Sequence, residues 1–366
     1  MRKVGYIFEE RFMWHQPLSQ QFTTLVQPYQ PFEHSDTKRR LHNLILVSGL
    51  YKHLIHLQDF TGASIEQLQS THGLDYIHDV INKSSREEGG IGGPEASFSQ
   101  YAYDIAILAV GGCLHAIDQI MERKIESAYC LVRPPGHHAI RDSAMGFCIF
   151  NNIAIAAKYV MQKYPDIVRK VAIVDYDVHH GNGTQEMFYD DGSVLFISIH
   201  QDSNYPQNSG FLTEVGDGKG KGMNVNIPLP PGSGRGAYKY AFDEVVAPLL
   251  RRFDADFILV SSGFDASYAD PLSAMMLSSD DFRYMTKTMK AVADDICEGR
   301  MLFAHEGGYS ELYVPFCGVA VLEELLEVED IIEDPFLNEV NNWGGQDLQT
   351  HQREAIDKVI RMHNLA

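Results

Sequence analysis

Two aspartates and a histidine alternate at the end of an apolar, strand-like run in the middle of the chain. If residues 171–180 form one strand, Asp175, Asp177 and His179 share a face. Two carboxylates and an imidazole are not buried together without compensation, which a bound cation supplies. Asp177 and His179 offer an oxygen and a nitrogen ligand, which suit zinc or a similar divalent metal. The simpler alternative is an Asp–His ion pair or a solvated loop end.

Asp265 follows a second apolar run and is the third candidate ligand, with a turn or helix-capping aspartate as the simpler alternative. Two aspartates and one histidine leave one coordination position open, as catalytic zinc sites do. A metal in such a site activates water and polarises a carbonyl group. The reaction then needs a base, for which His137 or His138 is suitable, and an oxyanion donor, for which Tyr309 is suitable. A buried core histidine and a surface tyrosine are the alternatives at these positions.

Other common hydrolase and nucleotide-binding motifs are absent from the sequence. No G-x-S-x-G, H-E-x-x-H or Walker A pattern occurs. Ser209–Gly210 and Ser233–Gly234 lack the required pattern, which excludes a serine nucleophile elbow there. The glycine-rich stretch Gly89–Pro94 follows a charged helical segment, so we expect a loop rather than a dinucleotide-binding turn.

The elements that must position these residues alternate between strands and helices along the whole chain. Short apolar runs rich in β-branched residues predict buried strands at Val4–Phe8, Ala128–Val132, Val171–Asp175, Val194–Ile199, Val225–Leu229, Phe257–Ser261 and Met301–His305. Helical patterns lie between them, at residues 35–49, 98–122, 149–163, 236–252, 279–297, 318–326 and 351–362. This alternation predicts one α/β domain over residues 1–366, with helices on both faces of a parallel sheet. Sites in such sheets form beyond the carboxyl ends of the strands, where the candidate residues lie.

The composition is that of a soluble globular protein and excludes several classes of function. The 366 residues include 30 Lys and Arg and 49 Asp and Glu, which give a formal net charge of −19. Such a chain is a poor nucleic-acid binder, because that binding depends on basic side chains that neutralise phosphates. Five scattered cysteines form no disulfide framework and indicate a reducing, cytoplasmic environment. The apolar stretch Ala102–Met121 includes Asp104, His115 and Asp118, so we expect a buried helix and no membrane association.

A series of motifs in order along the chain resembles the zinc-dependent histone deacetylases, and within them the class II-like bacterial histone deacetylase-like amidohydrolases. The motifs are His34–Arg39, Arg133–His138, Gly146–Cys148, Asp175–Gly183, Gly263–Asp265, Asp270–Pro271 and Glu306–Tyr309. The resemblance implies a single arginase-like α/β domain around a mainly parallel eight-stranded sheet. The catalytic motifs span residues 133–309, flanked by an N-terminal loop insertion at residues 9–40 and a C-terminal helix at residues 351–362.

The resemblance implies catalytic roles for residues in several of these motifs. It places one zinc ion per chain on Asp177, His179 and Asp265. His138 is then the general base that later protonates the leaving amine, and His137 is its electrostatic partner. Tyr309 is the oxyanion donor, and its presence favours true deacetylase activity, because family members with histidine at this position are feeble on acetyl-lysine.

The same resemblance implies residues that support this machinery. Asp175 lies behind His137, and Asn182 lies behind His138, where other classes have an aspartate that raises the basicity of the histidine more. Asp175 and Ser198 would also bind a potassium ion, together with backbone carbonyl groups.

A narrow substrate tunnel is a further feature that the resemblance implies. Its walls would be Gly146, Phe147, Tyr205 and Leu272. Apolar and aromatic walls suit the uncharged stem of an acyl-lysine.

The expected reaction is removal of acetyl or related short acyl groups from lysine side chains of a peptide or protein. Small acetylated polyamines are the alternative substrates, because an acidic surface attracts such cations. A two-manganese ureohydrolase shares the fold but needs more bridging carboxylates than this site supplies. A non-catalytic acyl-lysine binding module needs neither a base nor an oxyanion donor, so the His137–His138 pair and Tyr309 argue against it. The family branch also implies a homo-oligomer.

Overall fold

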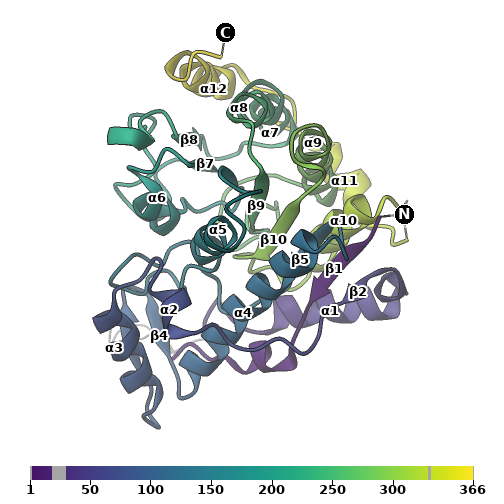
Figure 1. Cartoon of the computed structure of the whole chain (residues 1–366). Coiled ribbons are helices and arrows are strands. Elements are labelled where there is room, and N and C mark those ends of the chain that lie inside the picture. The colour runs from purple at the N-terminus through teal and green to yellow at the C-terminus, as the bar shows by residue number, and fades with distance from the viewer. Residues whose placement is uncertain (1, 19–29, 329–330, 366) are drawn as a thin grey trace, which may run out of the picture.

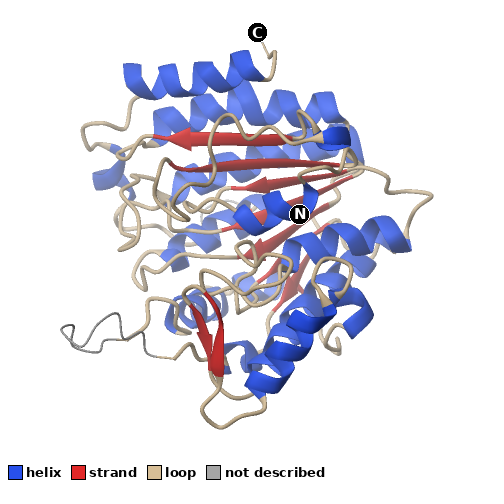
Figure 2. Cartoon of the chain, turned by 90° about the vertical axis from the view of Figure 1, so that its left-hand side faces the viewer, coloured by secondary structure: helices blue, strands red, loops and turns tan. Residues whose placement is uncertain are grey.

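The computed structural model describes residues 2–18, 30–328 and 331–365. An eight-stranded sheet in the order β2-β1-β5-β10-β9-β6-β7-β8 forms its centre, with helices on both faces (Figures 1 and 2). The strands are β1 (Val4–Ile7), β2 (Ile55–His56), β5 (Ser127–Cys130), β6 (Val171–Asp175), β7 (Val194–Gln201), β8 (Asn224–Leu229), β9 (Phe257–Ser262) and β10 (Met301–His305). Every neighbouring pair in this sheet is parallel, which confirms the predicted α/β class.

Seven of these strands coincide with the predicted apolar runs, and β2 was not predicted because it has only two residues and Ile55 is exposed. The interpretation of residues 171–180 as one strand is wrong, since β6 ends at Asp175. Side chains nevertheless continue to alternate between the hydrophobic core and the polar site beyond the end of the strand. Tyr176 and Val178 pack into the hydrophobic core, whereas Asp177 takes part in the polar cluster described below.

The sheet separates two hydrophobic clusters. Along β6, Ala172 and Val174 face one cluster, and Val171 and Ile173 face the other. The first cluster includes α1 (Asp36–Val47), α7 (Arg235–Ala241), the π-helical turn η4 (Phe242–Val246), α8 (Ala247–Phe253), α9 (Ser279–Cys297), α10 (Val314–Leu326) and α12 (Thr350–Met362). The second includes α2 (Ile65–Leu68), α3 (Leu74–Ser84), α4 (Ala102–Met121) and α5 (Asn152–Lys163). Burial on both faces explains why the strands are apolar without alternation.

Local capping and packing move some helix ends from their predicted positions. Helix α5 begins at Asn152 because the side chain of Asn151 caps it by accepting the N–H of Ala154. Helix α10 begins at Val314, before the predicted start, with a proline in its first turn. Helices α2 and α3 were not predicted, and the shorter elements η1 (Glu10–Trp14), η2 (Leu50–His53), α6 (Asn182–Phe188), η3 (Gly218–Gly220) and α11 (Leu337–Asn341) were not predicted either.

The prediction that Gly89–Pro94 is only a loop is wrong. Residues Gly90–Gly93 form β3, which pairs antiparallel with β4 (Ala96–Phe98) in a separate hairpin. Three glycines in four residues carry no strand pattern, so only the pairing with β4 reveals the strand. The tight turn between the strands places Glu95 next to the loop that contains Gly146 and Phe147.

Helix α4 is long and apolar enough to cross a membrane by length and composition alone, and it is the one described helix with this property. Inside the protein it packs against α5, β5 and β1, as expected for a core helix. Of the expected N-terminal insertion at residues 9–40, residues 19–29 lie outside the described residues, and α1 begins within it at Asp36. The expected C-terminal helix is α12.

Candidate active site

Three neighbouring strands, β10, β9 and β6, end at the same edge of the sheet and bring the candidate metal ligands together. The Nδ1 atom of His179 lies 3.1 Å from Asp177 Oδ1 and 3.1 Å from Asp265 Oδ2. All three side chains are buried, and their ligand atoms lie within 4.8 Å of one another. Tetrahedral zinc ligands at their usual bond lengths are about 3.3 Å apart. The spacing of Asp177, His179 and Asp265 therefore fits one zinc-sized ion.

Backbone groups hold the remaining carboxylate oxygens of the cluster. The N–H of Val178 donates to Asp265 Oδ1 at 2.8 Å, and the N–H of Gly307 donates to Asp177 Oδ2 at 2.8 Å. A Cβ atom at Gly307 would collide with both carboxylates, which explains the glycine in this motif. Asp177 Oδ1 also accepts the backbone N–H of His179 at 3.0 Å, so backbone donors orient both carboxylates toward His179.

The loop after β5 carries the histidine pair, whose ring centroids are 4.0 Å apart. His137 Nδ1 lies 2.9 Å from Asp175 Oδ2. Burial opposes a charge on His137, but the carboxylates of Asp175 and Asp177 outweigh it and raise its pKa to about 10. The contact with Asp175 therefore favours the charged form of the His137 ring.

The second histidine has a different environment. His138 Nδ1 lies 2.8 Å from Asn182 Oδ1, which can only accept, so Nδ1 carries the proton and Nε2 is left as the acceptor. Burial, followed by the nearby charge of His137, lowers the pKa of His138 well below its usual value. His138 lines the cavity described next, and His137 does not. The structure thus distinguishes two histidines that the residue pattern alone left equivalent.

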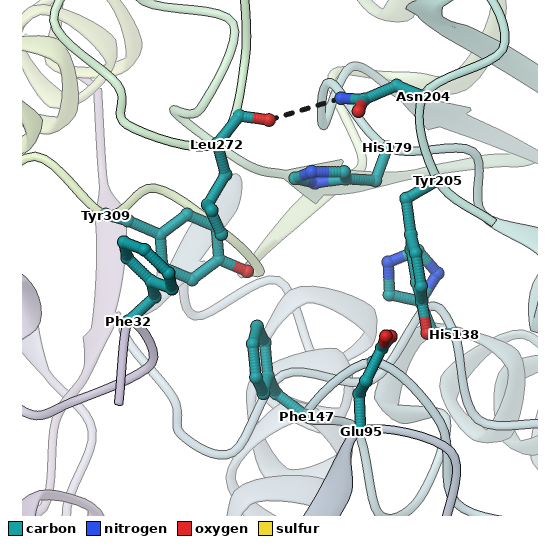
Figure 3. A pocket seen from close by; sticks show the side chains of 10 residues that line it. Phe32, Glu95, His138, Phe147, His179, Asn204, Tyr205, Leu272 and Tyr309 are labelled. Atoms are coloured by element: carbon teal, nitrogen blue, oxygen red, sulfur yellow. Dashed lines mark hydrogen bonds between the residues drawn. The ribbon is translucent and has the colours of Figure 1, made fainter. Parts of the chain in front are cut away.

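A cavity of about 240 Å³ leads to the cluster, and Figure 3 shows the side chains around it. The four predicted wall residues, Gly146, Phe147, Tyr205 and Leu272, all line it, together with His138, His179 and Tyr309. Phe32, Glu95 and Asn204 also line it and were not predicted, because loops distant in sequence contribute them. The Asn204 side chain donates to the carbonyl of Leu272 at 3.2 Å and so links two of these loops.

Tyr309 follows β10 and is nearly buried. Its backbone N–H donates to Asp270 Oδ2 at 2.7 Å, which ties the tyrosine loop to the loop after β9. Figure 3 shows its hydroxyl directed into the cavity. Burial, followed by the charge of Asp265, raises the pKa of Tyr309 well above its usual value, so the hydroxyl stays protonated and can donate.

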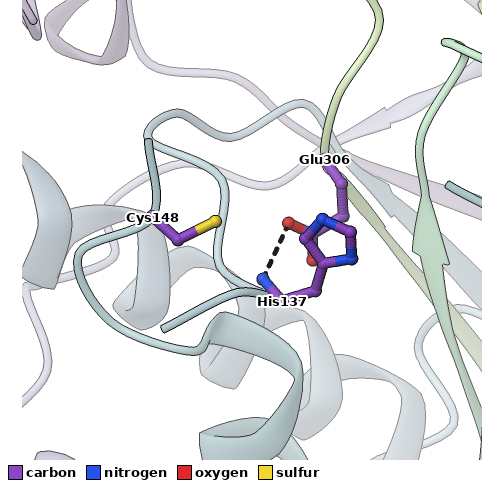
Figure 4. Close-up of side chains that lie close together, drawn as sticks. All are labelled: His137, Cys148 and Glu306. Atoms are coloured by element: carbon purple, nitrogen blue, oxygen red, sulfur yellow. Dashed lines mark hydrogen bonds between the residues drawn. The ribbon is translucent and has the colours of Figure 1, made fainter. Parts of the chain in front are cut away.

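A second buried cluster, formed by His137, Cys148 and Glu306, lies beside the first (Figure 4). Glu306 Oε2 accepts the N–H groups of Gly136 at 2.6 Å and His137 at 3.2 Å, and Oε1 accepts the hydroxyl of Ser261 at 3.2 Å. Burial, followed by the charge of Glu306, raises the pKa of Cys148 and so favours the thiol over the thiolate. We infer that Glu306 positions the histidine loop, a role that its motif position did not reveal.

Replacing Glu306 by alanine is expected to lower kcat about 10-fold or more, because two buried N–H groups lose their acceptor at about 1–3 kcal/mol each and the loop shifts. Glu306→Gln keeps an amide oxygen for the two N–H groups and should retain most of the activity. Steady-state kinetics of both variants, with thermal unfolding measured in parallel, test this expectation. Wild-type kcat in Glu306→Ala would contradict it.

A buried ion network supports the other side of the site. Arg133 forms a bidentate salt bridge with Glu33, with Nε 2.7 Å from Oε1 and Nη2 2.8 Å from Oε2. The Nζ atom of Lys38 lies 3.4 Å from Oε1 of the same carboxylate. The ammonium group of Lys38 also lies 5.8 Å from the centre of the Tyr309 ring. Burial alone would raise the pKa of Glu33, but Arg133 and Lys38 outweigh it and hold the pKa well below its usual value. Glu33 therefore stays ionised at neutral pH and compensates two buried cations.

Replacing Glu33 by glutamine should lower the free energy of unfolding by about 3–5 kcal/mol, because Arg133 and Lys38 are left buried without an anion. The exposed Glu298, which pairs with Arg123 and Arg300, is the matched control, and Glu298→Gln should cost less than about 1 kcal/mol. Urea denaturation of both variants measures the difference. Equal losses would show that the buried network adds no special stability.

Comparisons with known proteins agree with this geometry. Residues 31–325 match the model of the histone deacetylase domain. The chain is 42% identical to a histone deacetylase-like amidohydrolase of Pseudomonas aeruginosa, over 91% of this chain and 89% of that protein. It is 34% identical to a probable deacetylase of Archaeoglobus fulgidus, over 87% of this chain and 85% of the relative.

The crystal structure of the HDA15 HD domain superposes with a TM-score of 0.85 at 30% identity, covering 99% of this chain and 94% of that one. The match spans the sheet and the loops that carry the site. The chain therefore belongs to the histone deacetylase family and is a hydrolase that acts on amide bonds.

Proposed function

We propose that the protein is a zinc-dependent deacylase that removes acetyl or other short acyl groups from lysine side chains. The observation that carries this proposal is the cavity itself. Its base holds His179 of the Asp177–His179–Asp265 cluster, and its walls present His138 and Tyr309 to the same space. A metal-binding cluster, an unprotonated imidazole nitrogen and a phenol around one narrow cavity are the parts that amide hydrolysis requires.

The chain's own residues supply the proton transfers and the positioning. Zinc bound by the cluster would activate a water molecule and polarise the acyl carbonyl. Nε2 of His138 accepts a proton from the attacking water and later delivers it to the leaving lysine amine. The hydroxyl of Tyr309 donates to the carbonyl oxygen as negative charge develops there. His137, whose Nδ1 is paired with Asp175, lies beside His138 and acts as its electrostatic partner.

Potassium is part of the proposal as a structural ion. Asp175 and Ser198 are register partners on β6 and β7, and both are buried. A carboxylate and a hydroxyl next to backbone carbonyl groups are the hard oxygen ligands that such a cation prefers. The ion would stabilise the edge of the sheet from which Asp177 and His179 project. We also infer a cytoplasmic location from the five cysteines, all of which are buried free thiols.

The test is hydrolysis of fluorogenic acetyl-lysine and trifluoroacetyl-lysine substrates by the zinc-loaded protein. We expect turnover by the wild type and none above background by Asp265→Ala, whose zinc content should also fall. If both proteins are equally inert on these substrates, the proposal fails. Zinc analysis also separates this function from a two-manganese ureohydrolase, which would hold two divalent ions per chain.

Acetylated polyamines remain the second substrate class, because the cavity mouth carries the acidic Glu95 and the chain has a net charge of −19. A comparison of kcat/KM for acetylputrescine and for acetyl-lysine peptides distinguishes the two classes. A higher value for acetylputrescine would replace the lysine deacylase proposal by the polyamine one.

A further inference from the structure

Glu95 is the one carboxylate among the described residues that line the cavity. Its residue is exposed, and Figure 3 shows its side chain ending beside the hydroxyl of Tyr205 at the edge of the cavity. Burial, followed by the hydrogen-bonding interaction with the Glu95 side chain and then by its charge, raises the pKa of the Tyr205 phenol. The two side chains therefore lie close together at the edge of the cavity, where Glu95 is exposed.

The backbone holds Glu95 in a defined place. Its φ angle of 53° lies in the left-handed region, which costs free energy in a residue with a Cβ atom. The turn is attached to the opposite loop, because the carbonyls of Pro94 and Glu95 accept the N–H groups of Gly146 and Phe147 at 3.0 and 3.1 Å. The anchored turn therefore holds Glu95 in one place at the edge of the cavity.

The charged side chains around the cavity mouth are all acidic. We define the rim segments as the five described stretches that contribute its outer walls: residues 30–32, 93–97, 144–148, 202–207 and 270–274. These rim segments contain no lysine or arginine, and their acidic residues are Glu95, Asp202 and Asp270. Asp270 is buried and bound to the N–H groups of Leu272 and Tyr309, so it is not available at the surface. No ion pair joins Glu95 to any described lysine or arginine within 4.0 Å.

We propose that Glu95 selects substrates that carry a positively charged group next to the acylated lysine. This inference rests on the proposed deacylase function and deepens it by naming a substrate class: acyl-lysine peptides with a flanking arginine or lysine. A fixed carboxylate that is not paired with a protein cation attracts a cation on the substrate and repels an anion. Cationic peptides should therefore be better substrates than neutral ones, and anionic peptides should be worse. Asp202, which is exposed on a neighbouring rim segment, adds to the same field.

The experiment compares three acetyl-lysine peptides that differ only in the residue beside the lysine, which is arginine, glutamine or glutamate. At low salt we expect wild-type kcat/KM to be about fivefold higher for the arginine peptide than for the glutamate peptide, as for a partly exposed charge pair. In Glu95→Gln this ratio should fall towards one, because the carboxylate that distinguishes the arginine peptide from the glutamate peptide is lost. The kcat/KM for acetylspermidine is measured in parallel, because its ammonium groups are positively charged like the arginine side chain but belong to a polyamine.

Glu88→Gln is the matched control, because Glu88 is exposed just before the same hairpin, carries the same charge and does not line the cavity. The control should keep the wild-type ratio, and 0.5 M NaCl should reduce that ratio. A wild-type ratio in Glu95→Gln, or an equal loss in Glu88→Gln, would overturn the inference. If Glu95→Gln lowers kcat/KM for acetylspermidine but leaves the peptide ratio unchanged, Glu95 recognises polyamines, and the assignment to peptides is wrong. Absence of turnover with every peptide would instead count against the proposed deacylase function.

Discussion

His138→Ala is expected to lower kcat by about 10³-fold, within the range for loss of a general base. The hydrogen bond from Nδ1 to Asn182 leaves Nε2 of His138 as the proton acceptor that faces the cavity. No other described imidazole combines an acceptor nitrogen with this position, since His179 belongs to the metal cluster. KM should change little, because His138 acts on the water and the leaving amine rather than on substrate affinity.

His137→Ala is the informative comparison for this prediction. His137 does not line the cavity, and its Nδ1 is bound to Asp175, so its loss removes a charge and a packing contact but no proton acceptor. We expect a smaller decrease in kcat, of about 10- to 10²-fold, by the usual size of an electrostatic contribution. Zinc content and circular dichroism of both variants check that metal and fold are retained. The reverse order of damage would assign the base to His137.

Tyr309→Phe should lower kcat by about 10²- to 10³-fold, the usual effect of removing one oxyanion donor. The substitution deletes only the hydroxyl, which points into the cavity, and keeps the ring that contacts Phe147 and lies near Lys38. The backbone N–H that binds Asp270 is also kept, so the loop should not move. Substrate affinity should therefore change much less than kcat.

The measurement is the kcat and KM of Tyr309→Phe on an acetyl-lysine peptide, with binding of the uncleaved peptide followed by fluorescence anisotropy. Tyr101→Phe is the control, because Tyr101 is exposed at the start of α4 and lies outside the cavity. It should behave as the wild type. An unchanged kcat in Tyr309→Phe would remove Tyr309 from the mechanism, and a large loss of peptide binding would show that it acts mainly on affinity.

Much of the fold and of the metal cluster could be predicted from local patterns. Apolar runs such as Phe257–Ser261 are buried on both faces of a parallel sheet, and their composition reveals this without any partner. The spacing of Asp177 and His179 depends only on alternation along the backbone, so their shared face was also predictable. The assignment of roles to His138 and Tyr309 came from motif resemblance, and the structure adds the contacts that support it.

What failed or was missed depends on contacts between distant segments. The strand β3 is recognisable only through its pairing with β4, because glycines carry no pattern of their own. Glu306 looked like one residue of a turn motif, yet its partners are the N–H groups of Gly136 and His137, about 170 positions earlier in the chain. Glu95 and Phe32 joined the cavity through loop positions that no spacing rule anticipates.

The amino-acid sequence by itself determined the fold class and the types of ligand at the end of β6, because alternation and burial are local properties of the chain. Only the tertiary structure decided which strands are neighbours, and the order β10-β9-β6 is what brings Asp265 within 3.1 Å of His179. It also decided which of two adjacent histidines faces the cavity, and that Glu95 is the one carboxylate among the described residues that line it. These outcomes depend on the packing of loops that are far apart in sequence. Local patterns of hydrophobic residues carry no information about such contacts.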